Sequence, residues 1–196
     1  PVGPLILRLA LPCIVSMLVT AFYNMADTFF VGMLKSNAAT GAVGVVFALM
    51  AIIQAIGFFF GQGSGNFISR ELGGHRRDQA EEMAATGFLL SFAGGCLLTL
   101  LGLLFLEPVA RLLGADADLL PYCVRYGRIV LLGLIPFTLQ NVFQSFLVTA
   151  ERPHFGLYIT VGAGVTNMVL DALLVAVIPL EVEGAAIATV ISQCVG

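Results

Sequence analysis

The sequence predicts an all-α polytopic membrane protein whose six membrane spans form one helical bundle. Three observations carry this prediction: 59% of the 196 residues are hydrophobic, only 11% are charged, and the apolar stretches run for 20 residues or more. An ordinary soluble domain carries about 25% charged residues. Only helices and closed barrels satisfy their backbone groups in lipid, and a barrel strand needs only about 10 residues. The length of the stretches therefore favours helices.

Six apolar segments follow one another along the chain, separated by short polar loops. We expect them at about residues 4–32, 42–68, 80–106, 119–148, 155–178 and 184–196. Most exceed the roughly 20 residues that cross a bilayer, so tilts or kinks are expected. The chain begins at Pro1 and stops at Gly196 inside the last segment, which indicates a piece of a longer protein.

Charge predicts the orientation and excludes one class of partner. With a net charge of −3 and no basic run, the chain gives nucleic-acid binding no electrostatic support. Basic residues favour cytoplasmic loops, and the densest basic cluster lies in the loop at 69–82, on the side of the N-terminus. A cytoplasmic N-terminus is therefore expected. The basic residues are Arg8, Arg70, Arg76, Arg77 and Arg152 on the inner side, and Lys35, Arg111, Arg125 and Arg128 on the outer side.

Small residues mark the second segment, where Gly57, Gly61 and Gly65 recur every four residues. This spacing lets helix backbones approach closely in lipid, so we interpret it as packing rather than as a substrate site. The four cysteines have neither CxxC nor metal-ligand spacing, and we expect them to be small packing residues.

Two acidic residues are unusually placed. Of the twelve acidic residues, only Asp27 and Asp171 fall deep within predicted spans. An ionised acid at the bilayer centre costs roughly 2.5–3.5 kcal/mol on insertion scales. Because neither acid has Lys or Arg at similar depth in its own segment, each calls for a proton, a metal ion or a cationic ligand. The plainer alternative is a carboxyl satisfied by hydrogen bonds to Asn and Thr.

Each acid belongs to a polar stripe on an otherwise apolar helix. The stripes are Ser16, Thr20, Asn24 and Asp27 in the first segment, Thr160, Gly164, Asn167 and Asp171 in the fifth, and Thr189 and Ser192 in the sixth. Helical spacing places each set on one face. If the stripes converge, two carboxylates, an amide oxygen and a hydroxyl offer hard oxygen ligands that suit Na⁺. The same carboxylates, held together in a low dielectric, could instead keep a proton near neutral pH.

An uncharged polar set, Gln140, Asn141 and Gln144, lies in the fourth segment, with the first and last on one face. These amides could line a substrate path or hydrogen-bond between helices, and the sequence leaves both interpretations open.

Three stretches resemble the N-terminal half of the multidrug and toxic compound extrusion (MATE) transporters. They are "LALPCIVSMLVTAFYNMADTFFVG", "GQGSGNFISRELGG" and "TNMVLDALLV" followed by "EGAAIATVISQ". The likeness covers essentially all 196 residues. It implies that residues 1–196 form the N-terminal lobe of a twelve-helix transporter whose C-terminal lobe lies outside this sequence.

The resemblance also implies roles for particular residues. Asp27, Asn167, Asp171 and Thr189 match a set implicated in binding Na⁺ or a proton in prokaryotic members. Apart from the resemblance, the polar stripe of the first segment offers Thr20 and Asn24 as supporting residues. Pro12 matches a proline linked to bending of the first helix. The implied activity is efflux of organic cations and drugs against H⁺ or Na⁺ across the prokaryotic inner membrane, without an enzymatic step and without a cofactor other than the coupling ion.

Two alternative functions fit the sequence less well. A lipid-linked saccharide flippase of the same superfamily typically has a strongly basic cavity, whereas this chain has no Lys inside its spans. An intramembrane aspartyl protease would use two acids on separate helices, in Tyr-Asp and Gly-x-Gly-Asp contexts. Here the acids lie in "NMAD" and "MVLD", which do not match.

Overall fold

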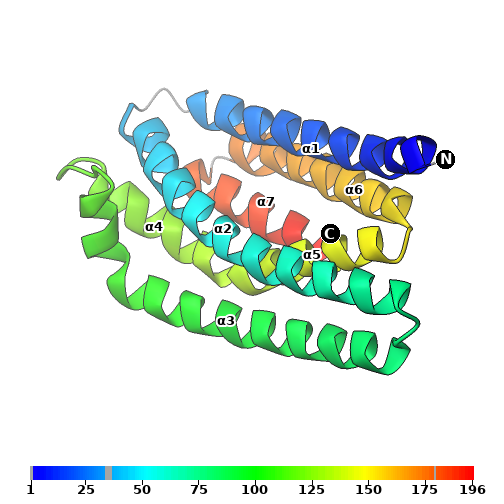
Figure 1. The fold of residues 1–196 in the computed structure, drawn as a ribbon. Coiled ribbons are helices and arrows are strands. Elements are labelled where there is room, and N and C mark those ends of the chain that lie inside the picture. The colour runs from blue at the N-terminus through cyan, green and yellow to red at the C-terminus, as the bar shows by residue number, and fades with distance from the viewer. Residues whose placement is uncertain (1, 34–36, 179) are drawn as a thin grey trace.

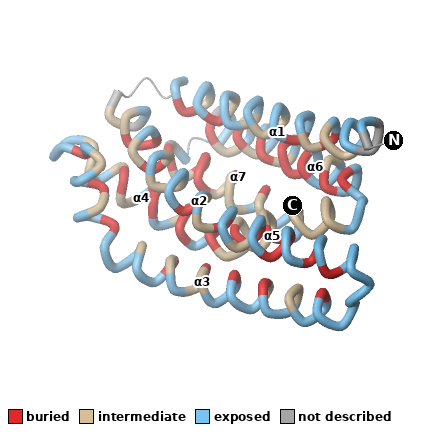
Figure 2. The backbone as a smooth tube through the Cα atoms, in the orientation of Figure 1, coloured by how far each residue is buried: buried red, intermediate tan, exposed pale blue. Residues whose placement is uncertain are grey.

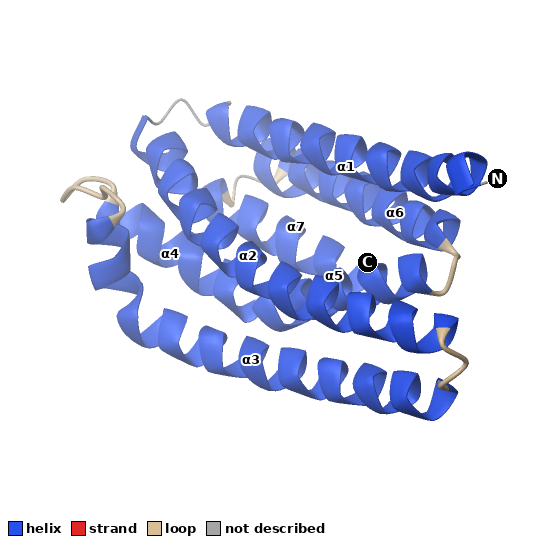
Figure 3. Cartoon of the chain, viewed as in Figure 1, coloured by secondary structure: helices blue, strands red, loops and turns tan. Residues whose placement is uncertain are grey.

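The computed structural model describes residues 2–33, 37–178 and 180–196, and these ranges form a bundle of helices joined by short loops (Figures 1 and 3). The predicted all-α membrane fold is confirmed. Lys35, one of the basic residues predicted on the outer side, lies outside the described residues. The elements are α1 (Val2–Gly32), α2 (Asn37–Gly73), α3 (Arg77–Leu112), α4 (Leu120–Leu132), α5 (Leu134–Thr149), α6 (Pro153–Asp171), the π-helical η1 (Ala172–Val177) and α7 (Glu181–Val195).

The long helices have the length and the surface of membrane spans. Four of those described, α1, α2, α3 and α6, are long and apolar enough to cross a bilayer. Their outer faces carry large exposed side chains such as Leu7, Phe59 and Leu104, each at least 60% exposed. Figure 2 shows the exposed residues on the outside of the helices and the buried ones along their inner faces. So much exposed apolar surface indicates contact with lipid, and the chain is a multi-pass membrane protein.

The structure divides the fourth predicted segment, 119–148, into α4 and α5, which meet at an angle of 50°. The break falls at Gly133, and Pro136 follows in the first turn of α5, where a missing N–H is tolerated. A Cβ atom at Gly133 would lie only 2.7 Å from Val190 Cγ2 on α7. The absence of a side chain at the break therefore lets α7 pack against it.

The helices form two groups on either side of the lobe interior. The α1 helix runs beside α6, while α2 packs against α3 and α5 (Figure 1). The α4 and α7 helices pack on each other, and at this end Val31, Val43, Tyr126 and Ala185 belong to one buried apolar cluster. The fifth predicted segment, 155–178, comprises α6 and η1, so the helical geometry changes immediately after Asp171.

The glycines of α2 lie against α5 at close range. The Ser145 hydroxyl donates a hydrogen bond to the Gly61 carbonyl at 2.9 Å. A Cβ atom at Gly61 would lie 3.3 Å from the Asn141 carbonyl oxygen and 3.4 Å from the Val142 Cα. Since these are backbone atoms, they cannot move aside as a flexible side chain can. The spacing of small residues thus serves close packing of two helices.

The close contact between α2 and α5 predicts a loss of stability that depends on the position substituted. We expect Gly61→Val to destabilise the protein by about 1–3 kcal/mol, because the new side chain overpacks the α2–α5 contact. The matched control is Gly63→Val in the same helix, where a Cβ atom meets nothing within 4 Å. Thermal unfolding of the purified, detergent-solubilised protein measures both variants. Equal losses at the two positions would contradict the packing argument.

Candidate functional site

The polar stripes of α1 and α6 meet inside the bundle. Asp27 on α1 is 2% exposed, and Asn167 and Asp171 on α6 are 1% and 0% exposed. Gly164, one turn before Asn167, allows the two helices to approach, because a Cβ atom there would lie 3.2 Å from the Tyr23 ring. The two acids, 144 positions apart in the sequence, lie close enough for their charges to interact.

Two further helices supply hydroxyl groups to this region. Tyr126 on α4 is 1% exposed and lies within electrostatic range of both Asp27 and Asp171. Its hydroxyl lies beside Thr189 of α7. The place of Tyr126 at this site could not be predicted from the sequence, because tyrosines in apolar segments are also common at the membrane interface. We refer to Asp27, Tyr126, Asn167, Asp171 and Thr189 as the carboxylate cluster.

Several oxygen atoms of this cluster lack hydrogen-bond partners. Asp27 Oδ1, Asn167 Oδ1 and both carboxylate oxygens of Asp171 are buried, and no donor for them is found in the described part of the chain. A buried polar group costs about 1–3 kcal/mol when it makes no hydrogen bond. The Thr189 hydroxyl does not serve them, because it donates to the Ala185 carbonyl at 3.0 Å. The arrangement therefore offers free oxygen ligands to a proton or a small cation.

A cavity of about 700 Å³ adjoins the carboxylate cluster. Asn24, Tyr126 and Thr189 line it, whereas the two acids are not among its lining residues. Its other walls are largely aromatic and methionine side chains: Met25, Phe29, Phe47, Met50 and Phe137. The cluster thus lies between the packed α1–α6 contact and an apolar cavity with one polar side.

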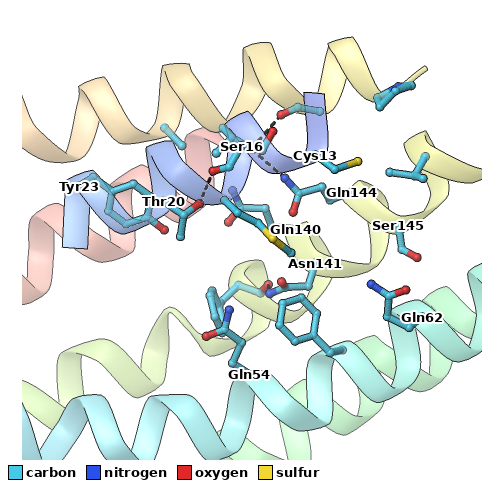
Figure 4. A pocket seen from close by; sticks show the side chains of 18 residues that line it. Cys13, Ser16, Thr20, Tyr23, Gln54, Gln62, Gln140, Asn141, Gln144 and Ser145 are labelled. Atoms are coloured by element: carbon cyan, nitrogen blue, oxygen red, sulfur yellow. Dashed lines mark hydrogen bonds between the residues drawn. The ribbon is translucent and has the colours of Figure 1, made fainter. Parts of the chain in front are cut away.

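A second cavity, of about 340 Å³, is rich in amides (Figure 4). Gln54 and Gln62 point into it from α2, and the predicted residues Gln140, Asn141 and Gln144 line it from α5. Thr20, Tyr23, Gln54 and Phe137 line both cavities, so the two adjoin.

The Gln144 side chain donates an interhelical hydrogen bond to Thr160 Oγ1 at 2.8 Å and also lines this cavity, while a substrate path along the α5 amides stays a prediction. No lining residue of either cavity is Lys, Arg, Asp or Glu within the described ranges.

Pro12 lies buried within α1, beside the amide-rich cavity that Cys13 lines. Because proline has no N–H, the helix lacks one backbone hydrogen bond at this point. The carbonyl left without its helical donor is that of Arg8, four residues before the proline. The half of α1 that carries Asp27 is thus joined to the rest of the helix through a weakened turn.

Ionisable residues buried within a multi-pass helical bundle mark a candidate functional site, and here they lie beside an internal cavity. The MatE family model matches residues 12–173, so the chain belongs to the MatE family, as the resemblance predicted.

Curated relatives and solved structures agree with this assignment. The chain is 26% identical over 193 residues to the multidrug export protein MepA of Staphylococcus aureus, covering 98% of this chain and 43% of that protein. It is 31% identical over 199 residues to an FAD transporter of Shewanella oneidensis, covering 100% and 44%.

Among solved structures, the outward-facing conformation of a multidrug resistance MATE family transporter matches with a TM-score of 0.92, 28% identity and coverage of 97% and 42%. The chain therefore spans less than half the length of these relatives.

The shared environment of Asp27 and Asp171 predicts non-additive effects. In the intact transporter, we expect Na⁺ or mild acid to raise the thermal unfolding temperature, and Asp27→Asn or Asp171→Asn to remove that increase. The double variant should lose no more than either single variant, because the two acids act as one site. Glu82→Gln, on the exposed start of α3, is the matched control. Independent, additive losses would contradict a shared site.

Proposed function

We propose that this chain is the N-terminal lobe of a secondary active multidrug exporter in the prokaryotic inner membrane, with its N-terminus in the cytoplasm. The transporter would exchange organic cations for H⁺ or Na⁺. The observation that carries the proposal is the buried pair of acids with unpartnered oxygens beside two cavities. A second, C-terminal lobe would complete the protein, since the relatives are more than twice as long as this chain.

The coupling ion would bind at the carboxylate cluster. Asp27 and Asp171 supply the negative charge, and Asn167, Thr189 and Tyr126 supply neutral oxygens. Asn24 and Thr20 line the cavity next to the cluster and would contact a hydrated ion on its way to the cluster. Oxygen ligands of this kind suit Na⁺, and a carboxylate pair in a low dielectric suits a proton, so the proposal includes both ions.

The cavities favour organic cations over polyanions. Aromatic faces attract cations, and methionine side chains adapt to ligands of different shape. Such cavity walls suit the activity that the name of one relative gives, the multidrug export protein MepA. The FAD transporter points to a phosphate-bearing substrate instead, and the alternative function of a lipid-linked saccharide flippase would also need basic groups. The described lining residues include no Lys or Arg, so we favour organic cations.

Coupling would act through α1. Two ligands exchange when they favour different conformations of the same protein. Asp27 and Pro12 lie on the same helix, and this helix also lines both cavities. Binding of an ion at Asp27 would favour one bend of α1 at Pro12, and binding of the organic cation would favour another. No covalent step is involved, so the proposed protein is a transporter and not an enzyme.

The central test is transport by the intact protein in proteoliposomes. A fluorescent organic cation is followed while Na⁺ and pH gradients are imposed separately. We expect Asp27→Asn to abolish gradient-driven exchange, because the cluster loses one of its two charges, whereas Glu82→Gln should behave as wild type. Unchanged exchange by Asp27→Asn would contradict the proposal. Release of a fluorophore from quenched peptides by the purified protein would favour the aspartyl protease instead.

A second test separates the substrate path from the ion site. We expect Gln140→Ala to raise the KM for the organic cation several-fold, because it removes one amide from the cavity wall. Ion-dependent thermal stabilisation should stay at the wild-type value, since Gln140 is outside the carboxylate cluster. A loss of ion stabilisation with an unchanged KM would reverse the assignment of the two regions.

A further inference from the structure

An exposed basic pair on α4 has no part in the proposed ion or drug site. Arg125 and Arg128 are three residues apart, so their side chains lie on neighbouring positions of one helix face. Both are exposed, and neither forms an ion pair with another described residue. Guanidinium groups on an apolar protein surface require a partner or water, because burying them in lipid is costly.

The pair lies on the side of α4 that faces away from the lobe interior. Tyr126 and Val130 of α4 line the larger cavity. Arg128 is two residues from each of them, a rotation of about 200° on a helix with 3.6 residues per turn. The basic face is therefore turned outward, away from this cavity.

Charged and apolar groups follow a definite order along this face. Asp118 is exposed and precedes α4 by two residues. Arg125 and Arg128 follow at about 8 and 12 Å along the helix axis from Leu120, the first residue of α4, at 1.5 Å per residue. Leu132, one turn further, is 62% exposed. From the membrane surface inward, the face thus presents a carboxylate, two guanidinium groups and an apolar side chain.

We propose that this face of α4 binds one phospholipid with an amine-bearing zwitterionic headgroup. Arg125 and Arg128 hold the phosphodiester through charge-assisted hydrogen bonds, which planar guanidinium groups make in pairs. Asp118 receives the ammonium group, which lies outside the phosphate in such a lipid, and Leu132 contacts an acyl chain.

An anionic headgroup fits this end of the lobe less well. Between residues 107 and 128, the three basic residues Arg111, Arg125 and Arg128 are balanced by the three acidic residues Glu107, Asp116 and Asp118. With no net positive charge, the region has no field that attracts an anion over a zwitterion. Asp116 is occupied locally, because its Oδ1 accepts the backbone N–H groups of Asp118 and Leu119.

The test is native mass spectrometry of the intact, delipidated transporter titrated with phosphatidylethanolamine, phosphatidylglycerol or phosphatidylcholine. We expect one phosphatidylethanolamine to be retained, and Arg125→Gln with Arg128→Gln to weaken its binding about tenfold or more. The lysine pair Arg125→Lys with Arg128→Lys should keep part of the binding, because charge remains while the paired hydrogen bonds are lost. The control Arg70→Gln with Arg77→Gln makes the same charge change at the opposite end and should leave binding unchanged.

A separate substitution tests the assignment of the headgroup. Asp118→Asn should reduce the preference for phosphatidylethanolamine over phosphatidylglycerol while leaving the phosphate contact intact. Stronger binding of phosphatidylglycerol by the wild type would overturn the zwitterionic assignment. Unchanged binding in the glutamine pair would overturn the site itself. Lipid-independent loss of thermal stability in that pair, without any bound lipid in the wild type, would show that protein covers this face. None of these outcomes depends on ion-coupled transport.

Discussion

The contact between α1 and α6 is the constraint on which the rest of the lobe depends. Gly164 lets the two helices approach, with Tyr23 and Val19 against its backbone. This approach brings Asp27 and Asp171 into one buried region. Tyr126 of α4 lies within electrostatic range of both acids. Burying two acids in lipid is unfavourable unless a proton or a cation accompanies them. The packing thus supports the proposed need for an accompanying ion.

The two sides of the interior differ in how firmly they are held. On one side, α2 and α5 are joined by glycines and by hydroxyl-to-carbonyl hydrogen bonds such as that of Ser145 to Gly61. On the other side, α1 contains a proline and borders both cavities. A helix with a weakened turn facing a rigid pair is suited to move when the occupant of a cavity changes. This contrast supports the proposal that the helix carrying Asp27 is the adjustable element.

Much of this arrangement could be predicted from the sequence, for reasons that particular residues illustrate. The fold class followed from composition, and Asp27 and Asp171 stood out because charge is rare in apolar segments. Helical periodicity placed Asn167 and Thr160 on the face of Asp171. Tyr126 could not be identified, because its role depends on which helix lies beside α1 and α6. The 50° break between α4 and α5 was also missed, since hydropathy continues unbroken across Gly133 and Pro136.

The most direct measurement of the central claim is equilibrium ion binding by the purified, intact transporter, with radioactive Na⁺ uptake and proton uptake or release recorded on the same sample. The account predicts saturable uptake of Na⁺ or H⁺ that Asp171→Asn abolishes, while the variant protein remains folded and retains its organic-cation binding. Saturable ion uptake that is unchanged in Asp171→Asn, or no saturable uptake by the wild-type protein, would contradict it.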